Sequence, residues 1–294
     1  MSSMSAPTTA LGLRMPTKAW TRTAVRVVLY AAVLFVFVMP LWTMVATVFS
    51  GTTLKTGQMS LFPGHFTLAN IRTAFRFGVG RGLLNSVIVT GVGLFLQVTV
   101  SAFAAYALAR KKFRGQAVVL LAILATMMMP EEVIAIPLYL VLGKVPDPLG
   151  GSDLLDSYSG LILPVVGWAL PIYVLTGFMK TIPAELEEAA RVDGARDLRI
   201  FFQIILPLCR PALGTCAVFG FLMIWDQYLL PLLVASTPHM YTMTLVVTSL
   251  SSSQEQGEGV RMAASLMLMI PSVLVYLGLQ RLFERGMLNG SLKG

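Results

Sequence analysis

Residues 82–109 read GLLNSVIVTGVGLFLQVTVSAFAAYALA, and this stretch contains no Asp, Glu, Lys or Arg. Arg81 precedes it, and Arg110, Lys111 and Lys112 follow it. A helix needs about 20 apolar residues to cross a bilayer, because it advances about 1.5 Å per residue through a hydrocarbon core about 30 Å thick. The stretch is therefore predicted to be a membrane-spanning helix with basic residues at both ends.

The composition of the whole chain agrees with a membrane protein. Of its 294 residues, 56% are hydrophobic and 12% are charged, and the mean hydropathy is +0.76. A soluble domain usually carries about 25% charged residues, so this chain has too few charges to cover a water-facing surface. The apolar content excludes a disordered chain, and two cysteines are too few for a disulfide scaffold.

Other intervals without charges predict further spans. Six helices are expected, at residues 27–49, 84–108, 116–140, 159–179, 212–235 and 262–281. The third and fifth are long enough only if they carry an acidic residue within the membrane. The predicted fold is an all-α integral membrane protein, with six transmembrane helices in residues 24–294 and a cytoplasmic N-terminal tail in residues 1–23.

The basic residues predict the orientation of the chain. Most of the 22 Lys and Arg residues fall on one side of the membrane if the N-terminus lies inside the cell. The positive-inside rule then places both termini in the cytoplasm, at the plasma (inner) membrane, with residues 180–211 as the largest cytoplasmic segment. The net charge of +8 is spread over the flanks of the spans, so it indicates no nucleic-acid partner.

The cytoplasmic segment 180–211 has the pattern of two short helices. Its start contains Pro183, which costs no hydrogen bond in a first helical turn, and acidic residues that favour a helix N-terminus. These acids are Glu185, Glu187 and Glu188. Gly194 can adopt the left-handed conformation that ends a helix, and a second amphipathic stretch, 198–205, is predicted to stop at Leu206-Pro207. The alternative is a solvated amphipathic linker at the membrane surface.

The spacing in this segment resembles the signature loop of ABC-importer permeases. In the sequence, three residues separate Glu188-Ala189-Ala190 from Gly194, and nine residues separate Gly194 from Ile204-Ile205-Leu206-Pro207. The chain is most similar to the maltose-type branch, whose members import sugars and related polyols. The other matching stretches are Asn85-Ser86, residues 104–110, Met129-Pro130, Trp225 with the polar residue after it, and the tail 280–294. The resemblance covers about residues 24–294 and is to the second permease subunit of that branch.

The resemblance implies a set of partners. In that family two related permeases form a heterodimer in membrane lipid, each loop docks on one of two ATP-binding subunits, and an external solute-binding protein delivers the cargo. ATP and Mg would then lie on the partner ATPase, with no cofactor, metal or catalytic residue in this chain. The residues that would form the ATPase-coupling loop are Glu185, Glu188, Ala189, Ala190, Asp193, Gly194, Ile204, Leu206 and Pro207.

Three acids, Glu131, Glu132 and Asp226, are predicted to lie inside the membrane. Charges there are costly and usually face a polar cavity or a partner, so they are candidates for a substrate pathway. Aromatic side chains near them would offer apolar faces to a sugar ring. These aromatic candidates are Trp168, Tyr173 and Trp225. The alternative is that the aromatics pack in the core and the acids pair with Arg of a partner. The family usually shows Asn after this Trp, so Asp226 departs from it and would suit an amino sugar or another cationic ligand.

Two alternative functions remain open from the residues alone. A six-span secondary transporter driven by an ion gradient would need inverted repeats and intramembrane ion ligands. A membrane-embedded enzyme would need a clustered catalytic set, and no H-E-x-x-H or G-x-S-x-G motif is present in the sequence. The outer loops 50–81 and 236–261 are candidate contacts for a binding protein, with solvated connections as the alternative.

Overall fold

The computed structural model describes residues 17–51, 59–252 and 257–291, with side chains described from Thr23 to Gly278 within these ranges. This part of the chain is helical apart from one antiparallel bridge between Ser50 and Phe66, so the all-α prediction is confirmed. Residues 1–16 of the predicted N-terminal tail, and residues 253–256 of the predicted outer loop 236–261, lie outside the described residues.

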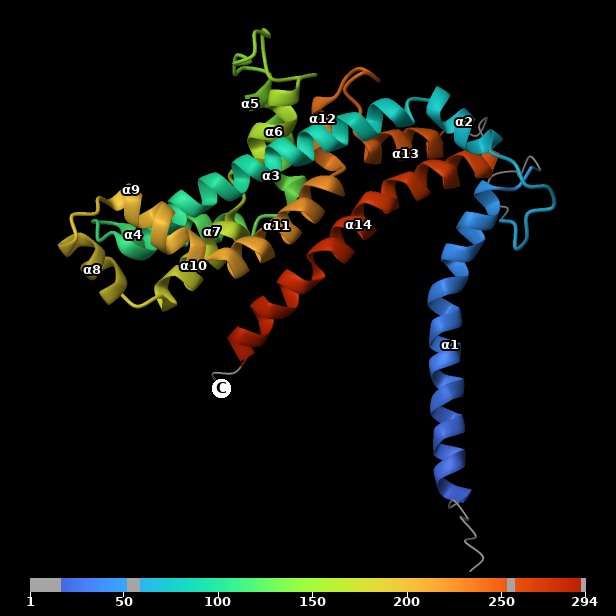
Figure 1. Cartoon of the computed structure of the whole chain (residues 1–294). Coiled ribbons are helices and arrows are strands. Elements are labelled where there is room, and N and C mark those ends of the chain that lie inside the picture. The colour runs from blue at the N-terminus through green and yellow to red at the C-terminus, as the bar shows by residue number, and fades with distance from the viewer. Residues whose placement is uncertain (1–16, 52–58, 253–256, 292–294) are drawn as a thin grey trace, which may run out of the picture.

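A long helix, α3 (Val79–Arg110), forms the centre of the fold (Figure 1). It packs against α6 (Tyr158–Val166), α7 (Ala169–Thr181), α11 (Arg210–Trp225) and α13 (Met243–Ser252). Small residues let the helices approach closely, as helices in membranes often do. Two of them, Ala102 and Ala105, are buried with Leu175 and Met179 of α7 in one apolar cluster.

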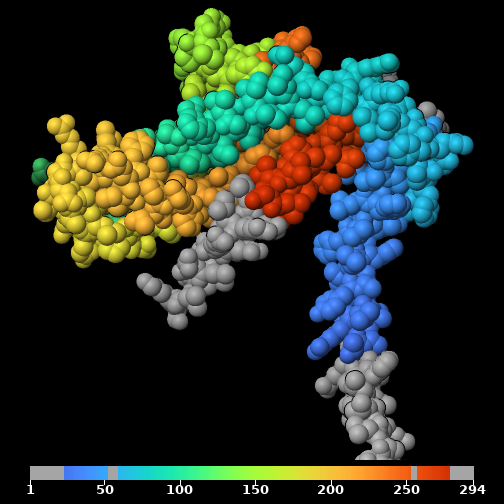
Figure 2. Space-filling model, viewed as in Figure 1, coloured from blue at the N-terminus to red at the C-terminus, as the bar shows by residue number. Residues whose placement is uncertain are grey.

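The first helix, α1 (Thr17–Val48), extends away from this body (Figures 1 and 2). All its side chains from Thr23 to Val38 are exposed, and burial begins only near its C-terminal end. There it meets α14 (Gly257–Ser291), which also packs against α11, α13 and a short helix, α2 (Ala69–Arg76). An apolar helix with no cover in its own chain needs lipid or another protein around it.

The predicted third span, residues 116–140, is divided into two helices in the structure. These are α4 (Gln116–Thr126) and α5 (Glu131–Leu142), and they meet at an angle of 103°. The break coincides with Pro130, whose backbone is extended at φ −60° and ψ 139°. Proline lacks a backbone donor and disfavours helical geometry in the residue before it, so a helix from α4 cannot run on smoothly into α5.

The predicted fifth span, residues 212–235, is also interrupted, between α11 and α12 (Leu229–Val234). Part of the predicted loop 236–261 is the helix α13. Within the described residues, four helices are long and apolar enough to cross a membrane. The number rises to six if two bent pairs, α4 with α5 and residues 197–208 with α11, are each counted as one span. The chain is therefore a multi-pass membrane protein with several broken helices.

The segment after α7 forms the end of the molecule coloured yellow in Figure 2. It contains α8 (Glu185–Val192), α9 (Asp197–Ile200), a π-helical turn η1 (Phe201–Ile205) and α10 (Leu206–Leu208). The two predicted helical stretches are present. The second covers residues 197–208, so it ends one residue beyond the predicted stop at Leu206-Pro207, and a bend of 76° separates it from α11.

Candidate functional site

Helix α8 ends as its sequence predicts. Gly194 has φ +79°, the left-handed region that glycine enters without steric cost. The amide of Gly194 donates to the carbonyl of Arg191 at 3.0 Å, and the amide of Ala195 donates to the carbonyl of Ala190 at 2.9 Å. This pair of bonds is the Schellman arrangement, which closes a helix and reverses the chain. The turn sets the direction of α9 relative to α8.

A buried ion pair attaches α8 to the end of α3. Arg110 Nε lies 2.9 Å from Glu187 Oε1, and the two side chains are only 9% and 7% exposed. Arg110 also donates to the carbonyl of Ile182 at 2.7 Å, just before α8 begins. Arg191, one turn after Glu187, lies 3.6 Å from its second oxygen. Sequence reasoning treated Arg110 as a membrane flank and Glu187 as one of the acids that favour the start of α8, and it did not pair them, since nothing local shows that they meet.

The second helical stretch is attached to α3 by charge and by aromatic packing. Lys111 Nζ lies 2.5 Å from Asp197 Oδ2, and this hydrogen bond holds the pKa of the Asp197 carboxyl below its usual value. Arg191 contributes a second cation at 3.4 Å. Phe201 is buried, with its ring 5.1 Å from the ring of Tyr106 on α3. The loop helices and the end of α3 therefore form one packed unit.

The predicted loop residues fall into an outer and an inner set. The outer set is exposed on α8 and its turn, and consists of Glu185, Glu188, Ala189, Asp193 and Gly194. Beside them the apolar side chains of Leu186, Val192 and Leu198 are exposed by 44%, 89% and 66%. The inner set is partly buried, and consists of Ala190, Ile204, Leu206 and Pro207. An exposed surface with small, acidic and apolar residues on a rigidly attached helix is suited to bind another protein.

The intramembrane acids lie at helix interruptions. Glu131 and Glu132 begin α5 directly after the break at Pro130, and Asp226 ends α11. Glu131 and Gln227 line a cavity of about 270 Å³ between α5, α6, α11 and α12, whose other lining is mostly apolar. All three acids are exposed in this chain. The structure thus places Glu131 at a cavity, and Glu132 and Asp226 are not part of its lining.

The three aromatic candidates lie in different surroundings. Trp225 is 2% exposed, stacks on Phe221 at 5.5 Å, and donates from Nε1 to the carbonyl of Leu268 at 3.1 Å. Trp168 is half-buried at the start of α7, and Tyr173 is 51% exposed on the same helix. Trp225 therefore joins α11 to α14 in this chain, and the aromatics do not gather around the cavity at Glu131.

A polar cluster at the other end of α3 was not predicted as a site. Asn85 is fully buried, and its Nδ2 donates to the carbonyls of His239 and Tyr241 at 2.8 and 2.9 Å. Its Oδ1 accepts from the hydroxyl of Tyr158 at 2.8 Å. The connection between α12 and α13 is thereby held against α3 and α6. The pair Asn85-Ser86 in the sequence was a signal for this cluster, but its partners are distant in the chain.

Comparison with known proteins identifies the group to which the chain belongs. Residues 97–289 match the family described as binding-protein-dependent transport system inner membrane component. The sn-glycerol-3-phosphate transport system permease protein UgpE of Pectobacterium atrosepticum is 35% identical over 79% of this chain and 83% of that protein. The diacetylchitobiose uptake system permease protein NgcG of Streptomyces coelicolor is 32% identical over 88% of this chain and 84% of that protein. The alpha-glucoside transport system permease protein AglG of Rhizobium meliloti is 37% identical over 79% of this chain and 62% of that protein.

The fold is similar to that of solved transporters. A bacterial ABC transporter that imports the acidic polysaccharide alginate contains a chain that superposes with a TM-score of 0.72, at 22% identity, over 91% of this chain and 98% of that one. The MetNI methionine ABC transporter contains a chain that superposes with a TM-score of 0.54, at 15% identity, over 72% of this chain and 97% of that one. The family match covers α8, its turn and the buried pair at Arg110 and Glu187. The chain belongs to the family of binding-protein-dependent transport system inner membrane components, and it is a permease subunit of an ATP-driven ABC importer.

Proposed function

We propose that a separate ATP-binding subunit contacts the exposed face of α8 and moves this helix when it hydrolyses ATP. The observation that carries this proposal is the buried pair between Arg110 and Glu187, which joins α8 directly to α3. A short helix attached in this way moves with α3 as one body when its outer face is pushed. Ala189 lets a partner surface approach closely, and Glu188 offers it an exposed charge. ATP and Mg would be bound by that partner, and this chain would make and break no bond.

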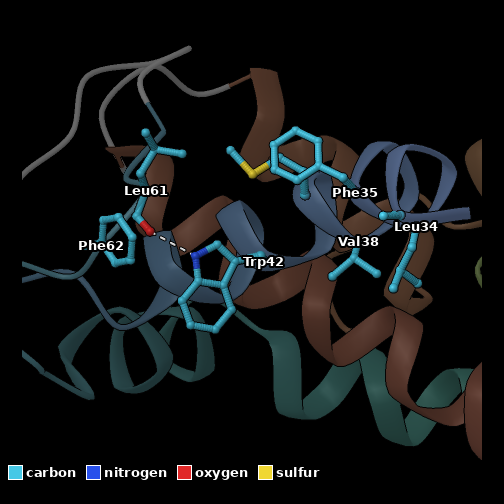
Figure 3. Close-up of a pocket in the computed structure, with 8 residues that line it drawn as sticks. Leu34, Phe35, Val38, Trp42, Leu61 and Phe62 are labelled. Carbon is cyan, nitrogen blue, oxygen red and sulfur yellow. Dashed lines mark hydrogen bonds between the residues drawn. The ribbon is translucent and has the colours of Figure 1, made fainter. Parts of the chain in front are cut away.

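The proposed assembly contains a second permease. Helix α1 exposes an apolar groove of about 680 Å³, lined in part by Leu34, Phe35, Val38 and Trp42 (Figure 3). Trp42 Nε1 donates to the carbonyl of Leu61 at 2.9 Å, so the polar edge of this ring is satisfied within the chain and its apolar face remains open. A membrane helix of the second permease would cover this groove. In this arrangement both termini lie in the cytoplasm, as the basic residues predict.

The proposed cargo is a sugar, amino sugar or polyol derivative that a solute-binding protein delivers from outside. The relatives support this class, because their names refer to sn-glycerol-3-phosphate, diacetylchitobiose and alpha-glucosides. The cavity between α5 and α11 supplies Glu131 and Gln227 as hydrogen-bonding groups within apolar walls. Carboxylate and amide groups of this kind can bind the hydroxyls of such a cargo as it passes.

Affinity purification of the tagged chain from its own host in a mild detergent tests this assembly. Mass spectrometry should identify a second permease and an ATP-binding protein in the wild-type preparation. With Glu188→Lys, the second permease should remain while the ATP-binding protein and ATP hydrolysis are lost. Lys112→Glu is the matched control, since it also reverses an exposed charge at the same end of the molecule and should retain both partners.

Three results would contradict the proposal. Recovery of the wild-type chain alone in folded form would favour a self-sufficient transporter. Full ATP hydrolysis and uptake by Glu188→Lys would exclude the α8 face as the coupling surface. Uptake that persists without ATP and stops when the ion gradient is collapsed would favour a secondary transporter.

A further inference from the structure

A hollow of about 470 Å³ lies over α2, far along the chain from the coupling helices. Its lining includes Phe66, Thr67, Arg72, Thr73 and Arg76. We call this region the α2 surface. Helix α2 is attached to α14 and α3 on its other side, where Ala74 is fully buried and Ile71 packs against an apolar cluster. The α2 surface therefore has a fixed backbone beneath it.

The α2 surface lies at the level where α1 leaves the membrane. The apolar run of α1 ends at Val48. Asn70 on α2 donates from Nδ2 to the carbonyls of Val48 and Ser50, at 2.9 and 3.0 Å. These bonds fix α2 beside the last turn of a membrane-spanning helix, at the depth of lipid headgroups. An amphipathic helix at this depth lies in the plane of the interface.

The charges of the α2 surface are all positive and have no partner in the described part of the chain. Arg72 and Arg76 are both exposed, and neither forms an ion pair with any described residue. They are four residues apart on one helix, a spacing at which like charges repel. The sequence contains no Asp or Glu before Glu131. An external anion between the two guanidinium groups would remove this repulsion, and guanidinium groups match the geometry of phosphate.

Apolar side chains line the hollow beside the two arginines. Of these, Phe66 is 72% exposed and Leu68 is 45% exposed. A free phosphate ion would leave these rings and chains in water, whereas an amphiphile would cover them with its acyl chains. Charge and apolar surface together favour one ligand class. We propose that the α2 surface binds an anionic phospholipid, with its phosphate between Arg72 and Arg76 and its acyl chains against Phe66 and Leu68.

Native mass spectrometry of the purified full-length protein tests the proposal. The protein is titrated with phosphatidylglycerol or phosphatidylcholine of the same chain length, and with inorganic phosphate alone. Wild-type protein should retain phosphatidylglycerol in preference to phosphatidylcholine. The variant R72Q/R76Q should bind phosphatidylglycerol on the order of 30-fold more weakly, since each basic residue near a membrane surface contributes about fivefold. The matched control K112Q/R114Q removes two exposed charges at the opposite end of α3 and should change this binding little.

Several outcomes would overturn the proposal. Equal retention of the two lipids by the wild-type protein would show that the surface does not select an anion, whatever the variants do. An equal loss in both double variants would show attraction by net charge alone. If inorganic phosphate binds saturably and displaces phosphatidylglycerol, the surface would be assigned to a free anion. If R72Q/R76Q loses an acidic partner protein while its lipid retention stays unchanged, the surface would be assigned to that protein. None of these outcomes depends on the ATP-binding subunit, so they are separate from the test at Glu188.

Discussion

Arg110 at the end of α3 and Glu187 in α8 form an ion pair of 2.9 Å that is almost fully removed from solvent. The pair joins the long central helix α3 to α8, the helix that faces the proposed ATPase. Burying two charges is costly, so a pair of this kind does little for stability by itself and is retained where it fixes a unique arrangement. Here the arrangement it fixes is the orientation of α8 relative to α3.

Breaking the pair from one side should be more harmful than replacing both partners. Glu187→Leu leaves Arg110 as a buried charge with only the carbonyl of Ile182 as its partner, which costs about 3–5 kcal/mol. We expect a clear fall in the melting temperature of the full-length protein and loss of ATP-driven uptake. The double variant Arg110→Met/Glu187→Leu should recover most of the melting temperature without recovering uptake. A double variant as unstable as the sum of the single ones would show that the two residues are not coupled.

The left-handed turn after α8 gives a second prediction. Gly194→Ala places a Cβ in open space, with no atom within 4 Å, so its effect comes from the backbone at φ +79° alone. An alanine in this region costs about 1–2 kcal/mol. We expect weaker coupling of ATP hydrolysis to uptake and a modest loss of stability. Gly177→Ala in α7 also meets no atom within 4 Å but has helical geometry, so it should be neutral or slightly stabilising.

The turn at Gly194 could be predicted because it depends on residues that are neighbours in the sequence. The partner of Glu187 could not be predicted, because it depends on how α3 and α8 pack. Several Lys and Arg residues flank the spans, and the sequence does not show which of them Glu187 meets. The sequence predicted one span over residues 116–140, and the 103° bend between α4 and α5 within it depends also on the packing of α5 against α12. Trp225 was a candidate for cargo because sequence cannot show which side of an apolar helix faces a cavity.

The interval without charges between Gln227 and Gln254 shows another limit of the same kind. Absence of charge indicates that a segment can enter a membrane, but it does not say whether the segment crosses it. In the structure this interval contains α12, a turn held by Asn85, and α13. The turn is possible at this depth because the buried amide of Asn85 satisfies two of its carbonyls. That compensation comes from α3, which is distant in the sequence.

The contact between Gly220 and Gln97 gives a prediction about the core of the spans. Gln97 is fully buried on α3 and donates to the carbonyl of Val165 at 2.7 Å, close to the break between α6 and α7. A Cβ at Gly220 would collide with the amide oxygen of Gln97 and lie 2.7 Å from Leu94. Gly220→Ala should therefore lower stability by about 1–3 kcal/mol, as overpacking does.

The melting temperature of the full-length protein measures this effect, with Gly91→Ala on α3 as a control that meets no atom within 4 Å. The combination Gly220→Ala/Gln97→Ala should not restore stability, because it removes the donor to Val165 as well as the clash. Wild-type stability in Gly220→Ala would mean that Gln97 can move aside without losing its hydrogen bond.

The ion pair between Lys111 and Asp197 should depend on pH in one direction only. The hydrogen bond from Lys111 lowers the pKa of Asp197 in the folded protein relative to the unfolded chain. The pair therefore stabilises the folded state at every pH above the ordinary carboxyl pKa of about 3.9, and this contribution is lost as the pH falls through the lowered value.

The difference in melting temperature between the wild-type protein and Lys111→Met should be small, because both side chains are partly exposed. It should stay constant from about pH 5 to pH 8 and shrink below about pH 4. A difference that does not shrink on acidification would mean that Lys111 acts through the ring of Tyr106, 5.7 Å away, and not through Asp197.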